Sequence, residues 1–259
     1  MDTTWSFPRP HDDADDLVAA GADLQPATLV AAYASGYFPM PLDPPSGDRP
    51  RRRGGRGPRI GWFSPRERGV LRPDALAVSG SLLRSTRRFR LSVDAEFASV
   101  MARCGDPSRQ GRWITDDIVD AYVDLHRLGF AHSVEVWDAD GDLVGGVYGV
   151  SLGALFAGES MFHTATDASK VSLVGLVAVL TAERPEVDPD ATSPLIDTQW
   201  QTDHLASLGI EEWSRDRYLA HLPTLTNADP PNFARWAADP DGFTDLARAK
   251  AGALRRVRR

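Results

Sequence analysis

The stretch GESMFHTATDASK, residues 158–170, brings a carboxylate, hydroxyls, an imidazole and an amine within thirteen positions. Ser160 suggests a hydrolase nucleophile. A nucleophile elbow, however, needs a glycine on each side of its serine at a spacing of two, and Phe162 stands at the second of those positions. A packing or hydrogen-bonding role is therefore predicted for Ser160. His163 and His204 lack the i, i+4 spacing of a metal-binding helix, so no metal site is predicted.

A second group of polar residues lies in LIDTQ, residues 195–199, which has the pattern of a buried strand. Asp197 and Gln199 are two positions apart, so on a regular strand their side chains point to the same face. If this strand pairs with the one that ends in GES, Glu159 joins them in a polar cluster. The alternative stays open that Asp197 caps the next segment and that Glu159 faces water.

Length and composition are those of a globular protein with a core of its own. The 259 residues are 42% hydrophobic and 25% charged, which is ordinary for a water-soluble chain. The single cysteine, Cys104, excludes an internal disulfide. The N-terminal residues show no signal-peptide pattern, and no apolar stretch reaches the roughly eighteen residues of a membrane span. We expect a cytoplasmic protein with no membrane partner.

The charge of the chain is unevenly distributed. The net charge of −7 argues against a surface that wraps nucleic acid broadly. Even so, six arginines and no acid lie between Arg49 and Arg59, and the segment SLLRSTRRFR adds Arg84, Arg87 and Arg88. Such patches suit a limited contact with phosphates, or else they are ordinary solvated surface. For the basic C-terminal end, LRRVRR, we favour the second interpretation.

Turn signals and periodicity divide the chain into a small N-terminal part and a larger unit. Helices are predicted within 13–36, and a Pro-, Gly- and Arg-rich segment then has the composition of a flexible loop. A basic helix, a strand and two helices precede a three-stranded meander over 132–162, a helix capped near Asp167, and the strand LIDTQ. The predicted domains are 1–72 with the loop 44–59, a catalytic domain 73–225, and a C-terminal extension 226–259 for which partial disorder is an open alternative.

The order of a meander, a helix and a further strand predicts an α+β protein whose second domain has a GNAT-like mixed sheet, the fold of acyl-CoA N-acyltransferases. Enzymes of that fold receive the pyrophosphate of acetyl-CoA on a glycine-rich turn at the start of the helix. Here that turn has no glycine after Gly158 and contains an acid. A different acyl donor and no bound cofactor are therefore predicted.

Several motifs in a fixed order make the chain similar to a known family over about residues 5–222. They are AYASGYFPM, WFSPRERGVL, RWIT, AYVDLHRLGFAHSVEVW, LVGGVYGVSLGALFAGESMF, DASK, LIDTQ and HLASLG. The chain resembles the leucyl/phenylalanyl-tRNA–protein transferases. The resemblance implies an enzyme that moves Leu, Phe or Met from aminoacyl-tRNA to the N-terminal Arg or Lys of proteins and so marks them for N-degron degradation. It also implies a small N-terminal domain before the GNAT-like one, and a monomer is expected.

The resemblance implies that the polar cluster is catalytic. Asp197 is expected to orient Gln199 and to hold the reacting amine, while Glu159 supplies negative charge for the cationic end of the acceptor. The donor aminoacyl-adenosine is expected to contact Trp62, Trp113, Tyr122, Val147, Phe156 and Ile196. Trp62 and Trp113 would stack on the base, as aromatic rings do on single-stranded nucleic acid, whereas Trp137 and Trp200 are predicted to be core. The basic residues Arg84, Arg87 and Arg88 are candidates for contacts with the tRNA backbone.

Two departures and two rival functions accompany the resemblance. Thr198 stands where the family usually has cysteine, and Val147 where it often has methionine. A non-ribosomal peptidyl-bridge aminoacyltransferase is one alternative, although that group has a duplicated GNAT unit and a longer chain. A non-catalytic protein that binds tRNA or a degron is the other, which loss of Asp197 or Glu159 would favour.

Overall fold

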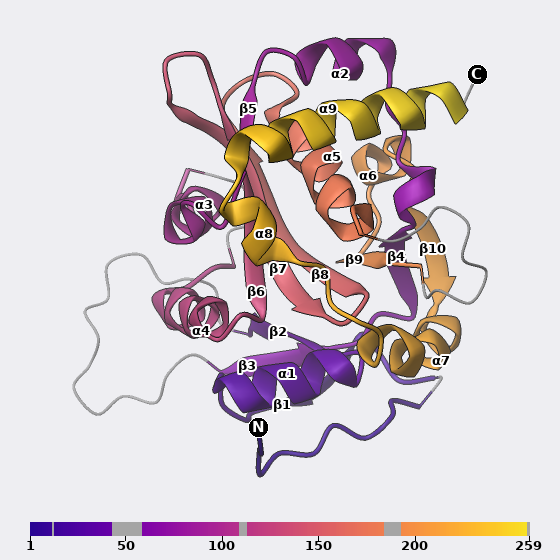
Figure 1. The fold of residues 1–259 in the computed structure, drawn as a ribbon. Helices are drawn as coiled ribbons and strands as arrows, with labels where there is room; N and C mark the ends of the chain where they lie inside the picture. Colours follow the sequence, from indigo (N-terminus) through magenta and orange to yellow (C-terminus); the bar gives the residue numbers. More distant parts are fainter. Residues whose placement is uncertain (12, 43–58, 109–112, 184–192, 258–259) are drawn as a thin grey trace.

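The computed structural model of the chain (Figure 1) describes residues 1–11, 13–42, 59–108, 113–183 and 193–257. Of the predicted Arg- and Pro-rich loop, all but the last residue lies outside the described residues. A small antiparallel sheet at the N-terminus has the strand order β1 (Leu17–Ala20), β3 (Ile60–Phe63), β2 (Phe38–Pro41). Helix α1 (Pro26–Ala34) lies between β1 and β2 along the chain.

A larger, mixed sheet of seven strands forms the centre of the molecule. Its order is β10 (Glu211–Ser214), β4 (Glu67–Leu71), β9 (Leu195–Gln199), β8 (Leu155–His163), β7 (Leu143–Leu152), β6 (Ala131–Trp137), β5 (Arg90–Val93). The strands β8 and β9 pair in parallel, and the other described pairs of this sheet are antiparallel. The predicted meander over 132–162 and the predicted α+β class are both confirmed.

Helices cover both faces of the larger sheet. One face packs against α2 (Gly80–Ser85), α5 (Ala168–Thr181), α8 (Phe233–Ala237) and α9 (Pro240–Val257). The other packs against α1, α3 (Phe97–Cys104), α4 (Asp116–Arg127) and the small sheet. Beside these lie η1 (Pro73–Ala75), α6 (Asp203–Ser207) and α7 (Arg215–Thr226), of which α7 packs on β4, β8 and β10. Strand β7 is almost continuously buried because both its faces are covered.

Helices α4 and α5 are stabilised in two different ways, by charged residues at the helix ends and by burial. Asp116 and Asp117 begin α4, and His126 and Arg127 end it, so charge at both ends complements the helix dipole. Helix α5 is instead buried along nearly its whole length. The reason is that α9 covers the side of α5 that faces away from the sheet (Figure 1).

The boundaries of the two sheets differ from the predicted domain limits. The small sheet ends with β3 at Phe63, and β4 already belongs to the large sheet from Glu67 onward, before the predicted boundary at 72. The described part of the C-terminal extension, 226–257, contains α8 and α9 packed into the core, so the alternative of partial disorder does not apply there. None of the helices in the described part of the chain has the length and hydropathy of a membrane-spanning segment.

Candidate active site

A bulge in β8 sets the position of Glu159. In the ladder between β7 and β8 the register shifts where Gly149 faces Gly158, and Glu159 is left as the extra residue. A Cβ on Gly149 would lie 2.1 Å from the carbonyl oxygen of Ala157, so only glycine fits there. Bulges re-aim side chains, and this one separates Glu159 from the regular alternation of its strand.

A second irregularity lies on the neighbouring strand β9. Its register with β4 shifts between Asp197 and Gln199, which leaves Thr198 as the extra residue. Gln199 has a φ of 60°, and a Cβ on Gly69 of β4 would lie 2.7 Å from Thr198 Oγ1. The regular alternation that predicted Asp197 and Gln199 on one face is therefore interrupted between them. The predicted pairing of β8 with β9 is nevertheless confirmed.

Glu159 is surrounded by hydroxyl and amide donors. Tyr33 donates from its hydroxyl to Oε1 of Glu159 at 2.6 Å, and Gln199 Nε2 donates to the same oxygen at 3.4 Å. Tyr122 donates to Oε2 at 3.3 Å and is hydrogen-bonded to the hydroxyl of Tyr33. Glu159 and Gln199 are therefore in direct contact, as the sequence predicted.

The environment of Glu159 favours its neutral form. Burial raises the pKa of the carboxyl, the hydrogen bond from Tyr33 opposes that rise, and the charge of Asp197 adds to it, with a net value of about 8. This shift of the pKa favours the protonated carboxyl in the unliganded protein. The predicted role of Glu159 as a source of negative charge then requires a bound cation that favours the ionised form.

Asp197 is fully buried, and its carboxylate is saturated with hydrogen bonds. Arg68 donates from Nε to Oδ1 at 2.8 Å and from Nη2 to Oδ2 at 2.5 Å, which makes a bidentate ion pair. The hydroxyl of Tyr218 donates to Oδ2 at 2.8 Å, and the main-chain N–H of Gln199 donates to Oδ1 at 2.9 Å. Asp197 thus orients Gln199 through its backbone. It has no exposed oxygen with which to hold a substrate amine, which corrects that part of its predicted role.

Arg68 is enclosed on all sides. Its side chain is 1% exposed, Nη1 donates to the carbonyl of Gly36 at 3.1 Å, and the guanidinium lies 5.0 Å from the ring of Phe38 and 4.5 Å from that of Tyr218. Burial lowers the pKa of this guanidinium, but the charge of Asp197 outweighs it and the net shift is upward. The buried ion pair of Arg68 and Asp197 therefore holds the main chain of Gln199 in place.

Three residues of this site were missed at the level of sequence, namely Arg68, Tyr33 and Tyr218. Arg68 and Tyr33 lie in the quoted motifs WFSPRERGVL and AYASGYFPM. An arginine beside the apolar run GVL is the one available signal, since a buried arginine needs a carboxylate partner. Nothing in the sequence pattern distinguishes Tyr218 from a core tyrosine on an amphipathic helix.

The predicted donor-binding residues fall into two groups on opposite faces of the large sheet. Tyr122 lies in the cluster that also holds Trp62 and, half-buried, Trp113. Val147, Phe156 and Ile196 are buried together in the core on the other side. Trp113 is partly exposed, whereas Val147, Phe156 and Ile196 are buried.

Trp62 does not offer a stacking surface here. Its side chain is 1% exposed, its indole N–H donates to the carbonyl of Gly21 at 2.7 Å, and Phe7 packs edge-on against it at 5.0 Å. A base could reach the ring only if Phe7 moved. The prediction that Trp62 stacks on the adenosine is corrected to a core role, because β3 places it inside the small sheet's core.

For Trp200 the prediction of a core position is wrong. It was predicted to be core, yet 36% of it is exposed directly after Gln199. Its ring packs edge-on against Phe38 at 5.0 Å and Phe63 at 5.9 Å, and Nε1 donates to Asp16 at 3.0 Å. An exposed, fixed indole beside the polar cluster is better placed for a base than Trp62.

Ser160 has no catalytic partner among the described residues. It pairs with Tyr148 in the ladder between β7 and β8, and no described histidine or carboxylate is within hydrogen-bonding distance of its hydroxyl. The imidazole of His163 is instead 3.3 Å from Ser169 Oγ.

Asp94, His126 and His132 form another titratable group, with potential ligand atoms within 4.8 Å of one another. His132 is hydrogen-bonded to Asp94 at 2.7 Å through Nδ1 and to the carbonyl of Gly129 at 3.2 Å through Nε2. The ring of His126 stacks on Phe97, and its Nδ1 is 2.8 Å from the carbonyl of Ala131. The imidazole nitrogens are thus hydrogen-bonded to carboxylate and carbonyl oxygens, so this group is a hydrogen-bond network at the C-terminal end of α4.

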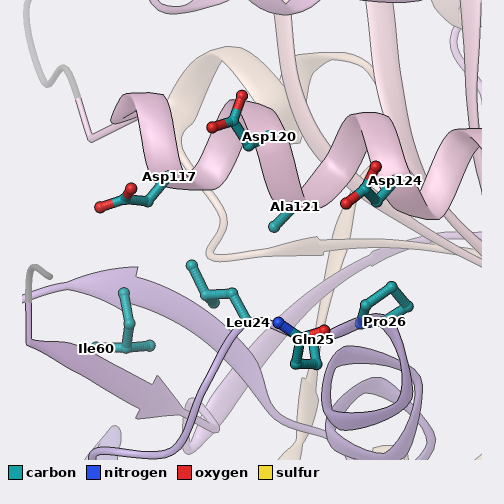
Figure 2. Close-up of a pocket in the computed structure, with 8 residues that line it drawn as sticks. All are labelled: Leu24, Gln25, Pro26, Ile60, Asp117, Asp120, Ala121 and Asp124. Carbon is teal, nitrogen blue, oxygen red and sulfur yellow. The ribbon is translucent and has the colours of Figure 1, made fainter.

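A cleft of about 310 Å³ lies between the segment that leads into α1 and one face of α4 (Figure 2). Its lining residues are Leu24, Gln25, Pro26, Ile60, Asp117, Asp120, Ala121 and Asp124. Tyr122, which contacts Glu159, extends from another face of the same helix. Three of the lining residues are aspartates of α4, so the α4 side of this cleft is polar.

Fold and site together define an α+β protein whose polar centre is built at two strand bulges over a buried arginine–aspartate pair. The sequence profile described as leucyl/phenylalanyl-tRNA protein transferase matches residues 70–223, and that of the N-terminal domain of the same family matches residues 22–47. The chain belongs to the leucyl/phenylalanyl-tRNA–protein transferase family.

Individual relatives agree with this assignment. Proteins named leucyl/phenylalanyl-tRNA–protein transferase are 44% identical over 232 residues in Aromatoleum aromaticum, covering 88% of each chain, and 45% identical over 230 residues in Pseudomonas putida, covering 87% of this chain and 91% of that one. The one in Anaeromyxobacter sp. is 46% identical over 237 residues, covering 89% and 92%. L-PGS from Bacillus licheniformis, a solved structure, aligns over 65% of this chain and 50% of that one with 11% identity and a TM-score of 0.33, too weak a likeness to argue from.

Proposed function

We propose that this protein transfers Leu, Phe or Met from aminoacyl-tRNA to the N-terminal Arg or Lys of acceptor proteins, which marks those proteins for N-degron degradation. The observation that carries the proposal is the contact between Glu159 and Gln199 above the buried Asp197, in a chain of this family. The donor is an activated ester. Its transfer therefore needs an amine that is neutral, close and aligned, and no enzyme nucleophile.

The chemical step balances without a further reactant. The nitrogen of the acceptor amine attacks the ester carbonyl, an amide bond forms, and the bond to the ribose oxygen breaks. The amine loses one proton and the departing ribose hydroxyl gains one. Gln199 positions the amine through its side-chain amide, which is far too weakly basic to take the proton itself. Asp197 holds Gln199 in place from below.

Glu159 fits the recognition of a cationic acceptor through a change of its ionisation. A guanidinium or ammonium beside the carboxyl favours the charged form, so the neutral Glu159 of the free protein would lose its proton as the acceptor binds. Binding of an Arg-initiated protein and ionisation of Glu159 are then linked. A neutral N-terminal side chain gives no such stabilisation and should be a poor acceptor.

The donor end is proposed to lie beside the polar cluster, on the face of the large sheet that carries Tyr122 and Trp113. Trp113 and Trp200 each present part of a ring to solvent and suit the terminal adenosine. For the tRNA backbone, Arg84, Arg87 and Arg88 are exposed at the end of α2 and just beyond it. An exposed guanidinium at each of these positions suits contact with phosphates.

The test is transfer of radiolabelled Phe from Phe-tRNA to two proteins that differ only in beginning with Arg or with Met. Labelling of the first alone is expected. Labelling of a cell-wall precursor peptide instead would identify the bridge-forming alternative. Binding of Phe-tRNA with no transfer to any acceptor would identify the non-catalytic alternative, and either result would refute the proposal.

A further inference from the structure

Helix α9 lies outside the region matched by the family profile, which ends at residue 223, yet it is part of the fold. Phe243, Ala247, Ala251 and Leu254 face the core beneath it. Its length runs beside α2 across the top of the molecule in Figure 1. The main chain of α9 is therefore held in place against the core.

Two arginines fix α9 against α2 in an antiparallel arrangement. Arg248 donates to the carbonyl oxygens of Thr86 at 3.4 Å and Phe89 at 3.3 Å, at the C-terminal end of α2. Arg255 donates from Nη1 to the carbonyl of Val78 at 3.4 Å, just before α2 begins. The C-terminal turns of α9 thus lie over the start of α2.

The two segments that meet here carry only one sign of charge. Residues 79–90 and 246–257 together contain no aspartate or glutamate. Arg256 is exposed near the end of α9, Arg84 is exposed on α2, and Arg87 and Arg88 are exposed just after α2. Among the acids close by, Asp245 pairs with Arg248 at 3.3 Å and Asp167 is hydrogen-bonded to Ser85 and Lys170. We call the set Arg84, Arg87, Arg88, Arg255 and Arg256 the basic face.

The guanidinium of Arg255, on α9, lies beside Gly80 in the first turn of α2, which has no charged side chain of its own. A Cβ on Gly80 would lie 3.2 Å from Nη2 of Arg255, so the guanidinium fills the space into which a side chain at position 80 would extend. Within the described part of the chain, Arg255 makes one hydrogen bond, to the main chain, so N–H donors remain that could bond a phosphate.

The basic face lies within reach of a nucleic acid whose end is at Glu159. Asp167, eight residues after Glu159, accepts a hydrogen bond from Ser85 of α2 at 2.9 Å. Eight residues span at most roughly 30 Å, which is about one turn of a nucleic-acid duplex. A tRNA with its acceptor end at the polar cluster is therefore long enough to reach α2 and α9 around the sheet that separates them from α1 and α4.

We propose that Arg255 and Arg256 of α9 bind phosphates of the tRNA backbone and extend the surface formed by the α2 arginines. The inference rests on the proposed function for the identity of the nucleic acid. Because the protein as a whole has a net charge of −7, a duplex is attracted only where positive charge is concentrated. Helix α9 is thereby a tRNA-binding element that this chain adds to the family's matched region.

The experiment compares two double variants of equal charge change. Arg255→Gln with Arg256→Gln removes two charges from the basic face, and Arg127→Gln with Arg235→Gln removes two exposed arginines on α4 and α8. Affinity for Phe-tRNA is measured over a series of salt concentrations, together with kcat at saturating Phe-tRNA. The first variant should lower the salt slope by about 1.4–1.8 units, or 0.7–0.9 for each lost phosphate contact, with kcat unchanged. The control should keep the native slope.

A third variant restores the charge from the neighbouring helix. Gly80→Arg in the Arg255→Gln, Arg256→Gln background should recover about half of the lost slope, since it returns one guanidinium to the same end of α2. An unchanged slope in a native-like, active double variant would overturn this inference alone, as would an equal loss in the control. Absence of transfer by the native protein would instead overturn the proposed function.

Discussion

The substitution Asp197→Asn tests how far the site depends on its buried ion pair. An asparagine oxygen in place of Oδ1 keeps the bonds from Arg68 Nε and from the N–H of Gln199. The amide nitrogen in place of Oδ2 then faces Arg68 Nη2, and two donors oppose each other where a 2.5 Å charge-assisted bond existed. The guanidinium, 1% exposed, is left without a counter-charge.

The expected loss of stability follows from this burial. Removing one partner of a buried pair costs about 3–5 kcal/mol, because the remaining charge stays desolvated. Urea unfolding at constant m-value measures it directly. In a cycle with Arg68→Met, the double variant should lose several kcal/mol less than the sum of the single losses, since each single variant strands the other charge.

The exposed pair Arg9–Asp216 provides the matched control. Its atoms are 2.6 Å apart, but the side chains are 60% and 48% exposed, so Arg9→Gln should cost only about 0–1 kcal/mol. If Asp197→Asn costs no more than Arg9→Gln, the pair does not support the site, and the positioning role given to Asp197 fails.

Three further predictions concern the polar cluster and its substrates. In the folded protein Glu159 keeps its proton up to about pH 8, against 4.5 for an ordinary glutamate, so its contribution to the free energy of unfolding falls as pH rises between those values. Glu159→Gln should therefore flatten this part of the pH profile in urea unfolding, and an unchanged profile would refute the assignment. If apolar side chains bind the donor amino acid, as the resemblance to the family implies, Asp-tRNA and Lys-tRNA should be refused while Leu-, Phe- and Met-tRNA are used, which competition in the transfer assay measures. Ser160→Ala should retain near-native transfer, and a trapped acyl-serine would revive the nucleophile.

The topology was predictable because its signals are local and periodic. Alternating apolar residues and turn glycines marked the meander, and the strand LIDTQ was placed beside the strand of Glu159 from the order of elements. Two carboxylates and an amide in adjacent strands were enough to predict a polar cluster. What alternation could not predict is the pair of bulges, because a single extra residue changes the direction of every later side chain.

Burial of individual side chains was the weaker part of the prediction. Trp62 and Trp200 were assigned in reverse, since aromatic residues favour both cores and stacking sites and the sequence does not show which ring has a neighbour such as Phe7. Arg68 was passed over because its partner is 129 positions away along the chain. Contacts of that range become visible only when the strands are in place.

The central claim is that Gln199 positions the attacking amine. It is tested most directly by the rate of Phe transfer from Phe-tRNA to an Arg-initiated peptide, compared between the native protein and Gln199→Ala. The affinity for tRNA is measured on the same preparations. If Gln199 positions the attacking amine above Asp197, the variant should bind tRNA as the native protein does and transfer Phe about a hundredfold more slowly. Transfer at the native rate by Gln199→Ala would contradict the account.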